Sequence, residues 1–520
     1  MNRKRLITLL TATIITGSIF AGCGKKEITT GGGEQTKGYL ASKSSIELTV
    51  HLGTNESGVF NDDWAIFKKA GEMTNVKLKG TLPKTTTDFA QAFNLMIASG
   101  DIPDIVQGNN VSFFKFGSEG AFEPLDELIE KNAPHLKKFL DENPDVKAMA
   151  TGPDGKIWFI PFVQDGQAQS GWFLRQDWLD RLGLKAPKTV DELHEVLKAF
   201  REKDPNGNGK KDEIPYFHRN AKQGIDDLLI LWKAYPSFYA VDGKVIFGPK
   251  EKEYKTALEN ISAWYKENLI DKEIYTRGAK ARDILLADNI GGTTHDLFGS
   301  TANYNDQLKN KINGFLFAPV TPPAGVDGKV RESTKRLKAR TYGWGISSSN
   351  KHKVETIKYF DFWFTEEGRR MANFGIEGDT YTMKEGKPLF TDKVLKGDKP
   401  AVEIIRQTGA QSNFGFQQDY FYEQQWTNPI ANKSIEEYVS KNYFIEQYPT
   451  LKFTQEEQKE IDKTIVKINT YVTETTQQWI LGAKPVNFEE FTGQLDKLGA
   501  NKMIEINQKA YDRYMKESKK

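Results

Sequence analysis

Apolar and polar positions between residues 46 and 106 follow two different periods. Residues 46–51 and 76–80 alternate between apolar and polar, as expected of strands, and residues 100–106 turn into a buried strand. Residues 63–72 and 88–99 carry their apolar side chains at helical spacing, with Phe89, Phe93 and Met96 on one stripe. This order of strand, helix, strand, helix and strand predicts an α/β lobe built on a doubly wound sheet.

The later part of the chain is richer in helical patterns. Residues 156–162 and 171–175 are apolar, and we predict that they form a hairpin. Thr189 and Glu192 fit a capping box that starts a helix, and Thr454 is a second cap. Helices are predicted at residues 122–129, 176–184, 190–200, 226–233, 251–267, 353–364, 454–481 and 488–519.

A loop rich in side-chain oxygens follows the helix that Thr189 begins. Counted from Asp204, oxygen side chains stand at positions one, three, five and nine, and Gly209 stands at six, as in an EF-hand loop. Position twelve is Pro215, so we assign its ligand role to Glu213; the alternative is a turn held by its own hydrogen bonds. The predicted Ca²⁺ ligands are Asp204, Asn206, Asn208, Lys210 through its carbonyl, Asp212 and Glu213.

Residues 1–22 have the pattern of an export signal. Arg3, Lys4 and Arg5 precede an apolar stretch that is too short to span a bilayer. The stretch ends in Ala21-Gly22-Cys23, which resembles a bacterial lipobox, so we expect Cys23 to be lipidated and to anchor the protein at the membrane. The alternative is an ordinary signal peptide. Residues 23–45 contain few large apolar side chains and are predicted as a flexible tether.

Composition and charge exclude some classes of partner and of covalent cross-link. The formal net charge is +2 over 520 residues, and loss of the signal removes three positive charges, so a nucleic acid partner is not expected. Cys23 is the only cysteine, which rules out an internal disulfide. The 10 Trp, 19 Tyr and 32 Phe residues supply aromatic faces of the kind that sugars stack on, although many must belong to the core.

Several sequence segments resemble segments of the large carbohydrate-binding lipoproteins of bacterial ABC importers. They are residues 175–184, 204–215, 263–271, 342–347 and 375–381, and they occur in the order found in that family. The nearest group is the calcium-containing branch that includes binders of alginate oligosaccharides and glycosaminoglycan disaccharides. The resemblance implies that a sugar is presented to a membrane permease and that the calcium ion has a structural role.

The same resemblance implies a fold of two α/β lobes, of the periplasmic-binding-protein type, with a ligand cleft between the lobes and several hinge crossings. We expect one lobe to comprise residues 46–165 and about 320–400. The other would comprise residues 166–319 and about 401–520.

Candidate ligand contacts lie where loops leave predicted strands, because ligands gather at strand ends in open α/β sheets. Amides, carboxylates and Arg forks suit sugar hydroxyls and acidic groups, and aromatic rings suit sugar faces. Turn formation, surface pairing and hinge packing are the alternative roles. The candidates are Trp172, Arg175, His218, Arg219, His295, Asp296, Phe298, Ser300, Arg340, Trp344, Gln418, Tyr420 and Glu423.

An acidic, uronate-containing oligosaccharide is the favoured ligand, mainly because of the resemblance. A neutral oligosaccharide binder of the same type is the first alternative, and a peptide binder is another. A secreted, calcium-stabilised glycoside hydrolase is the competing class, since it needs only two suitably placed carboxyl groups. The chain shows no nucleophile elbow, HExxH motif, phosphate-binding loop or CxxC motif, so we predict a binding protein and not an enzyme.

Overall fold

The computed structural model describes residues 39–54 and 57–517. The predicted signal peptide, the lipidation site at Cys23 and the tether up to residue 38 lie outside this part. Within it, no helix is long and apolar enough to cross a membrane.

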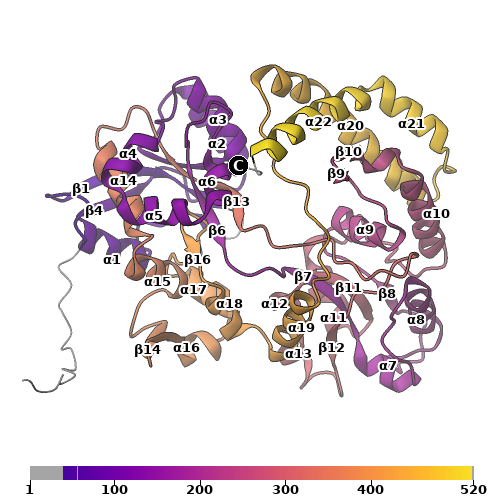
Figure 1. Cartoon of the computed structure of the whole chain (residues 1–520). Coiled ribbons are helices and arrows are strands. Elements are labelled where there is room, and N and C mark those ends of the chain that lie inside the picture. Colours follow the sequence, from indigo (N-terminus) through magenta and orange to yellow (C-terminus); the bar gives the residue numbers. More distant parts are fainter. Residues whose placement is uncertain (1–38, 55–56, 518–520) are drawn as a thin grey trace, which may run out of the picture. The chain divides into compact units, whose positions relative to one another are not determined.

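A six-stranded sheet organises the first core (Figure 1). The strand order is β16-β6-β13-β5-β1-β4, in which β1 is parallel to β4 and β5, β6 is parallel to β16, and β13 is antiparallel to both of its neighbours. The strands are β1 (Ile46–His51), β4 (Val76–Gly80), β5 (Ile105–Asn109), β6 (Ile160–Gln164), β13 (Ala339–Ile346) and β16 (Gln417–Gln418).

Helices pack on this sheet and enclose the first core. Helix α1 contacts β4, whereas α3 and α6 contact β13. The helices are α1 (Ala65–Thr74), α2 (Phe89–Ser99), α3 (Asn110–Ser118), α4 (Asp126–Asn132), α5 (Pro134–Glu142), α6 (Pro144–Ala150), α14 (Lys353–Phe362), α15 (Glu366–Phe374), α16 (Asp392–Leu395), α17 (Ala401–Arg406) and α18 (Tyr420–Trp426). Two ribbons accompany them, β2 (Gly53–Thr54) with β3 (Gly58–Val59) and β14 (Tyr381–Lys384) with β15 (Lys387–Phe390).

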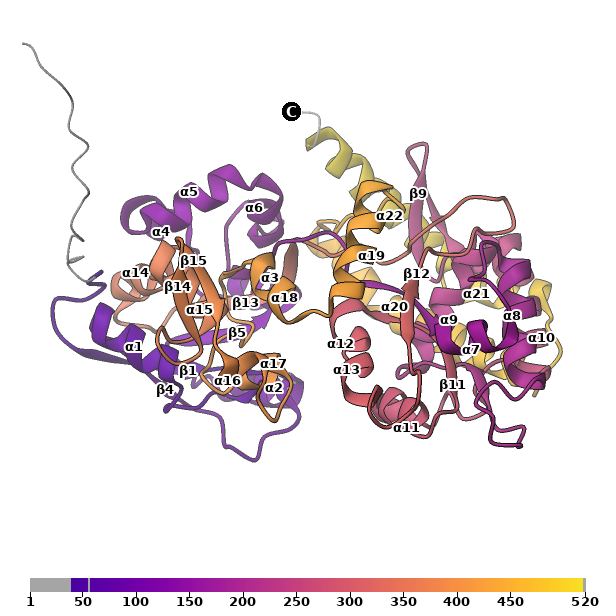
Figure 2. The ribbon, with the colours of Figure 1, turned by 90° about the horizontal axis from the view of Figure 1, so that it is seen from below.

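A four-stranded sheet of order β12-β7-β11-β8 organises the rest of the described chain. Its strands are β7 (Ser170–Arg175), β8 (Ile214–Tyr216), β11 (Gly291–Leu297) and β12 (Phe317–Val320), and the ribbon is β9 (Phe238–Val241) with β10 (Lys244–Phe247). Figure 2 shows two strands of this sheet, β11 and β12. Only β8 and β11 run parallel.

Helices α8, α9 and α11 pack on β11, and α10, α20, α21 and α22 form an outer layer. The helices are α7 (Gln176–Leu182), α8 (Val190–Glu202), α9 (Ala221–Leu229), α10 (Lys252–Lys266), α11 (Ala281–Ala287), α12 (Phe298–Ala302), α13 (Tyr304–Leu308), α19 (Pro429–Ser440), α20 (Gln455–Ile480), α21 (Phe488–Lys497) and α22 (Ala500–Glu517). Short 3-10 helices are η1 (Ile230–Trp232), η2 (Gly248–Lys250) and η3 (Gly278–Lys280).

Most predicted elements are confirmed, and three predictions differ from the structure. Residues 160–164 and 170–175 do not pair as a hairpin, because β6 pairs with β13 and β16 whereas β7 pairs with β11 and β12. The helix predicted over residues 488–519 breaks at Gly499, whose φ of +100° suits glycine and ends the helical backbone. Thr454 and Glu457 form a full capping box, whereas Glu192 accepts from the Lys188 amide and not from that of Thr189.

Three segments connect the sheets: residues 165–169, 321–338 and 427–428. The first two are paired, since the Arg336 amide donates to the Gln167 carbonyl over 2.7 Å and Ala168 bridges Lys335. Ile404, Phe414 and Tyr422 pack in the first core, so we propose that the first lobe extends to the segment at residues 427–428.

Candidate functional site

Polar side chains line one edge of the six-stranded sheet. The parallel strands β1, β5, β6 and β16 end there at His51, Asn109, Gln164 and Gln418. Strand β13 runs the other way and brings its first half to the same edge, where Tyr342 lies opposite Asn109. Ligands of open α/β sheets gather at such an edge, so it is the first place to look for a binding site.

A pocket of about 520 Å³ opens at the ends of β1 and β5. It is lined by His51, Gly53, Thr54, Phe89, Ala90, Phe93, Asn94, Gln107, Gly108, Asn109, Ser112, Tyr342 and Asn413. Aromatic rings and side-chain amides therefore meet in one cavity. That combination suits a sugar, whose ring faces are partly apolar and whose rim carries hydroxyl groups.

The Gln107 side chain on β5 is hydrogen-bonded to two other segments that line this pocket. Its Oε1 accepts from the Gly53 amide over 3.2 Å, and its Nε2 donates to the Asn413 carbonyl over 2.9 Å. Gly53 is needed beside it, because a Cβ at this position would lie 2.4 Å from the Phe89 ring. The pocket wall is thus built by close packing around an amide that is hydrogen-bonded to two other segments.

His51 forms the buried end of the pocket. The side chain is 6% exposed, and its ring meets the Phe93 ring edge to face at 6.4 Å. Burial lowers the pKa of His51 to about 4, so the imidazole is neutral in ordinary buffers. It presents one donor and one acceptor and no charge.

Arg340 begins a chain of side-chain hydrogen bonds along the same edge. Its Nε donates to Gln164 Oε1 over 2.5 Å, and its Nη2 donates to Gln169 Oε1 over 3.2 Å. Gln164 donates to Gln418, which donates to Gln411 over 2.6 Å. These bonds hold a half-buried guanidinium group beside the pocket, which is the arrangement that a carboxylate clamp requires.

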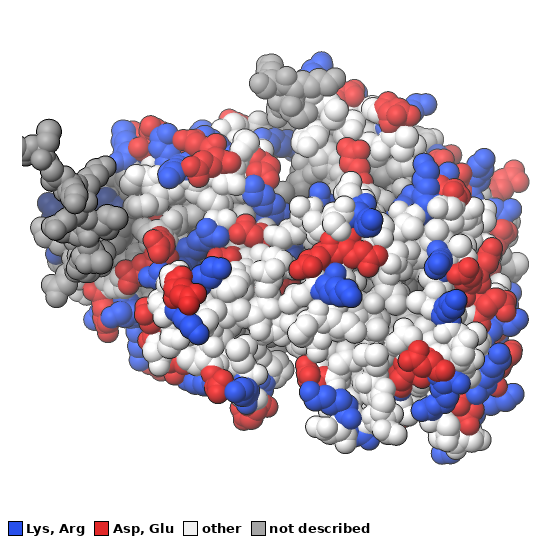
Figure 3. All heavy atoms as spheres, turned by 60° about the horizontal axis from the view of Figure 1, so that its bottom comes forward, with Lys and Arg blue, Asp and Glu red and all other residues white. Residues whose placement is uncertain are grey.

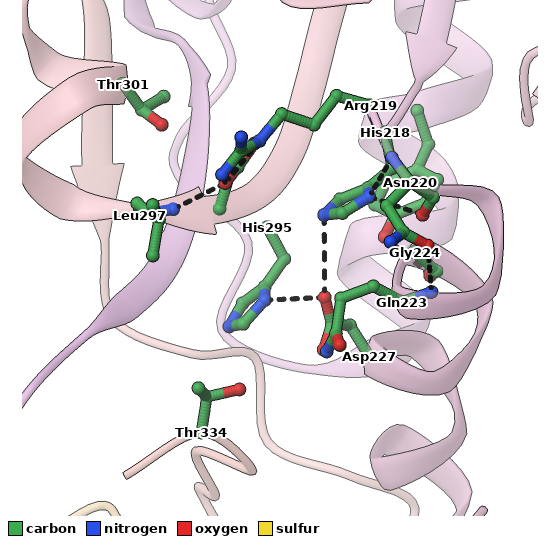
Figure 4. Close-up of polar contacts among 12 residues, drawn as sticks. His218, Arg219, Asn220, Gln223, Gly224, Asp227, His295, Leu297, Thr301 and Thr334 are labelled. Atoms are coloured by element: carbon green, nitrogen blue, oxygen red, sulfur yellow. Dashed lines mark hydrogen bonds and ion pairs between the residues drawn. The ribbon is translucent and has the colours of Figure 1, made fainter. Parts of the chain in front are cut away.

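The corresponding edge of the four-stranded sheet gathers another group of predicted residues (Figure 4). His295 and Asp296 on β11 lie opposite Trp172 and Gly171 on β7, and Arg219 follows β8. Arg219 donates through Nε and Nη2 to Asp296 over 2.9 and 3.0 Å. Burial alone would raise the pKa of Asp296, but Arg282 and Arg219 hold it below its usual value.

His295 lies between two buried carboxylates. Nδ1 is 2.8 Å from Asp227 on α9, and Nε2 is 3.0 Å from Glu332 in the 321–338 segment. Burial would lower the pKa of His295, but these two charges hold it well above its usual value, so the ring is an imidazolium. Burial lowers the pKa of the neighbouring His218. These contacts hold the strand ends in place at the sheet edge where half-buried Arg219 lies.

The other side chains predicted to contact the ligand pair or pack with residues of the protein itself. Arg175 pairs with Asp177 and Asn289, Trp344 stacks on Phe360 in the first core, and Phe298 packs against Tyr438. Trp344 pairs with Gln107 of β5 and Ile160 of β6, two residues further into the sheet than Tyr342, and it lies in the first core. Ser300 accepts from Arg282, and Glu423 binds Arg336, whose guanidinium lies over the Tyr420 ring.

The oxygen-rich loop folds around its own hydrogen bonds. Asp204 accepts from the amides of Asn208 and Gly209, and Asn206 and Asn208 donate to Asp212. Within the described residues, no three His, Cys, Asp or Glu side chains are grouped closely enough to form a metal site by themselves. Glu213 stands apart, because both its carboxylate oxygens are buried without a hydrogen-bond donor.

Sequence reasoning missed most of the pocket. From the sequence alone, His51, Phe89 and Phe93 are assigned only to a strand and a helix, and Gln107 and Asn109 have no assigned role. The strand-end rule that selected residues 218–219 and 295–296 applies equally to His51 and Asn109, so it was the available signal. The alignment of Tyr342 and Asn413 with those strand ends depends on sheet pairing between distant segments.

Residues 56–370 match the model of a family described as bacterial extracellular solute-binding protein. The match covers more than half of the chain. This protein belongs to that family.

Solved structures and curated proteins agree with this assignment. The crystal structure of alginate-binding protein AlgQ2 without calcium ion is 40% identical, with a TM-score of 0.83 over 91% of this chain and 99% of that one. FusA, a fructooligosaccharide ABC transporter substrate-binding protein of Streptococcus pneumoniae, is 27% identical over 97% of both chains. The structure of FusA with kestose has a TM-score of 0.73 at 25% identity, over 91% of this chain and 100% of that one.

A Bacillus subtilis protein, the polygalacturonan/rhamnogalacturonan-binding protein YtcQ, is 25% identical over 76% of this chain and 77% of its own length. The predicted solute-binding family and the predicted α/β fold are therefore confirmed.

Proposed function

We propose that this protein captures an oligosaccharide outside the cytoplasm and delivers it to the permease of an ABC importer. The observation that carries the proposal is the pocket at the ends of β1 and β5, where aromatic rings and amides meet beside Arg340. Family membership supports the same role. FusA is named as a substrate-binding protein of an ABC transporter, and AlgQ2 and YtcQ as binding proteins, which supports capture without cleavage.

We further propose that the oligosaccharide contains uronate residues. Alginate and polygalacturonan, which AlgQ2 and YtcQ are named as binding, are acidic, whereas the fructooligosaccharides named for FusA are neutral. Two half-buried guanidinium groups, of Arg340 and Arg219, stand at the two sheet edges and can pair with carboxylates. Lys and Arg are otherwise interspersed with Asp and Glu on the face shown in Figure 3, so acidic recognition would be local.

The loop at residues 204–213 is proposed to hold a structural Ca²⁺ ion. Carboxylate, amide and carbonyl oxygens are the ligands that this hard cation takes, and the two unpartnered oxygens of Glu213 fit a cation better than they fit a buried turn. When bound, Ca²⁺ would neutralise the carboxylates of the loop. An EF-hand mutant of FusA has also been studied, which supports a metal loop in relatives. Lipid anchoring through Cys23 completes the proposal, and labelling with a lipid precursor would detect it.

Isothermal titration with purified uronate oligosaccharides and with neutral xylo- or manno-oligosaccharides tests the ligand class. We expect the uronates to bind more tightly. Arg340→Gln should weaken uronate binding about tenfold or more, because a hydrogen bond to a charged group is lost, and should leave neutral sugars nearly unaffected.

Lys338→Gln is the matched control for that titration. It removes a positive charge two residues from Arg340, but Lys338 pairs with Asp145 at an exposed position. Binding of the neutral set alone would overturn the acidic ligand, and release of reducing ends from the oligosaccharides would overturn the binding-protein role.

A further inference from the structure

A chain of side-chain amides runs from Arg340 into the first core. Arg340 donates to Gln164 over 2.5 Å, and Gln164 donates to Gln418 over 3.0 Å. Gln418 donates in turn to Gln411 over 2.6 Å, and Gln411 donates to the Asn373 side-chain oxygen over 3.0 Å. The exposed fraction falls to 7% at Gln418, 1% at Gln411 and 0% at Asn373, so the chain of amides ends deep inside the protein.

The chemistry at the two ends of this amide chain sets its direction. Asn373 Oδ1 accepts from the Asp419 amide over 2.7 Å. Its Nδ2 donates to the carbonyls of Arg369 and Gln417 over 2.8 and 2.9 Å, so backbone groups allow the Asn373 side chain one orientation. At the other end, a guanidinium group has donors and no acceptor. Each amide in between therefore accepts from the side of Arg340 and donates toward Asn373.

Hydrogen bonds that all run in one direction polarise and strengthen one another. If one amide turned over, donor would face donor or acceptor would face acceptor at its neighbours, and a buried group without a partner is costly. The orientation of Gln164, and with it the position of the Arg340 guanidinium group, therefore depends on Gln411 and Asn373. Neither of these two residues is among those that line the pocket at the ends of β1 and β5.

The backbone around Gln411 has an unusual conformation. Gln411 and Asn413 each have a φ of +59°, in the left-handed region that favours glycine. Such conformations persist only where the surrounding contacts fix them. The Gln411 amide donates to the Ala372 carbonyl over 3.0 Å, and the Asn413 carbonyl accepts from Gln107 over 2.9 Å. Residues 411–413 therefore connect the amide chain to the wall of the pocket.

We propose that Gln411 and Gln418 are positioning residues, which act on the ligand through Arg340 and do not touch it. The inference rests on the proposed function, in which Arg340 pairs with a carboxylate of the ligand. The amide chain holds the guanidinium group in its binding position before the ligand arrives, so less conformational freedom is lost on binding. Without the chain, the charge remains but takes several positions, and affinity falls.

A double-mutant cycle tests this role, with calorimetric titration of a uronate trisaccharide prepared from alginate. Gln411→Met keeps the length of the side chain and removes its donor and its acceptor. We expect it to weaken binding about fivefold in the native background and by less than about 1.5-fold in the Arg340→Gln background. Gln418→Met, at a less buried position, should give the same pattern and serves if Gln411→Met does not fold.

Asn350→Leu is the matched control, because Asn350 is another buried amide with hydrogen bonds of its own. It is 3% exposed and donates to the Asp104 carbonyl and to Thr356 over 3.3 and 2.9 Å, outside the amide chain. Its loss should lower Tm and leave the affinity for the trisaccharide unchanged.

A purely structural role of Gln411 would weaken binding by the same factor in both backgrounds. That result, or unchanged affinity in folded Gln411→Met and Gln418→Met, would overturn the positioning role and leave the proposed function standing. If the native protein binds only neutral oligosaccharides, the acidic ligand and the positioning role fail together. If it binds neither the trisaccharide nor a neutral oligosaccharide, the proposed function fails and the positioning role fails with it.

Discussion

Glu213 lies at the end of the oxygen-rich loop, and its carboxylate is buried without a hydrogen-bond donor. Burial, together with the nearby charges of Asp212 and Asp204, raises the pKa of Glu213 above its usual value. Without a cation, the folded state holds this proton more tightly than the unfolded chain does. The free energy of unfolding therefore falls as pH rises from the ordinary pKa through the raised one.

We predict that Ca²⁺ removes this loss of stability. At one hundred times its Kd, Ca²⁺ should add about 2.7 kcal/mol to the free energy of unfolding, and a chelator should lower Tm at neutral pH. Glu213→Gln should make the metal-free protein more stable at neutral pH and remove most of the calcium effect. Thermal melts with and without chelator from about pH 4 to about pH 8 measure both results.

Glu202→Gln provides the control for these melts, because Glu202 is exposed at the end of the helix before the loop. It should keep the full calcium effect. A chelator that alters sugar affinity while leaving Tm unchanged would contradict the structural role of the metal.

At the scale of elements, glycines set how closely helix α2 approaches the ends of β1 and β5. A Cβ at Gly53 would meet the Phe89 ring at 2.4 Å, and a Cβ at Gly108 would meet the Phe93 ring at 2.9 Å. Both rings come from the apolar stripe of α2. The stripe was predicted from the sequence, but its contact with strand ends that lie elsewhere in the chain follows only from the packed sheet.

We predict that Gly53→Ala changes the pocket more than it changes the fold. Phe89 must move to make room, so affinity for the oligosaccharide should fall about tenfold while the free energy of unfolding falls by about 1–3 kcal/mol. Gly493→Ala is the control, because no atom lies within 4 Å of a Cβ added there and the residue is within α21. That change should stabilise slightly and leave sugar binding unchanged. Unaltered sugar affinity in Gly53→Ala would place the ligand elsewhere.

At the scale of the whole molecule, two ion pairs hold the 321–338 segment in place. Glu332 meets the His295 imidazolium of the second sheet, and Arg336 binds Glu423 of α18 over 2.7 and 2.8 Å. Arg336 also donates to the Asp165 carbonyl. One short stretch therefore joins both cores and a second connecting segment, so its charges couple parts that are distant in sequence.

We predict that Arg336→Gln lowers the free energy of unfolding by about 3 kcal/mol, because it leaves the largely buried Glu423 carboxylate without its partner. Lys396→Gln breaks an exposed pair with Asp392 and should produce no measurable loss. Urea unfolding of the two variants compares them. Equal stability of both variants would show that the Arg336 contact does not contribute.

The sequence by itself determined the periodic elements, the caps and the oxygen spacing of the 204–213 loop, because each depends on neighbouring residues. It also selected Arg219 and Asp296, whose positions follow the strand-end rule. Only the tertiary structure decided that Arg340 and Tyr342 join His51 and Asn109 at one edge, that Trp344 lies in the core, and that β6 and β7 belong to different sheets. The physical reason is that strand pairing and burial depend on residues hundreds of positions apart, which local periodicity does not encode.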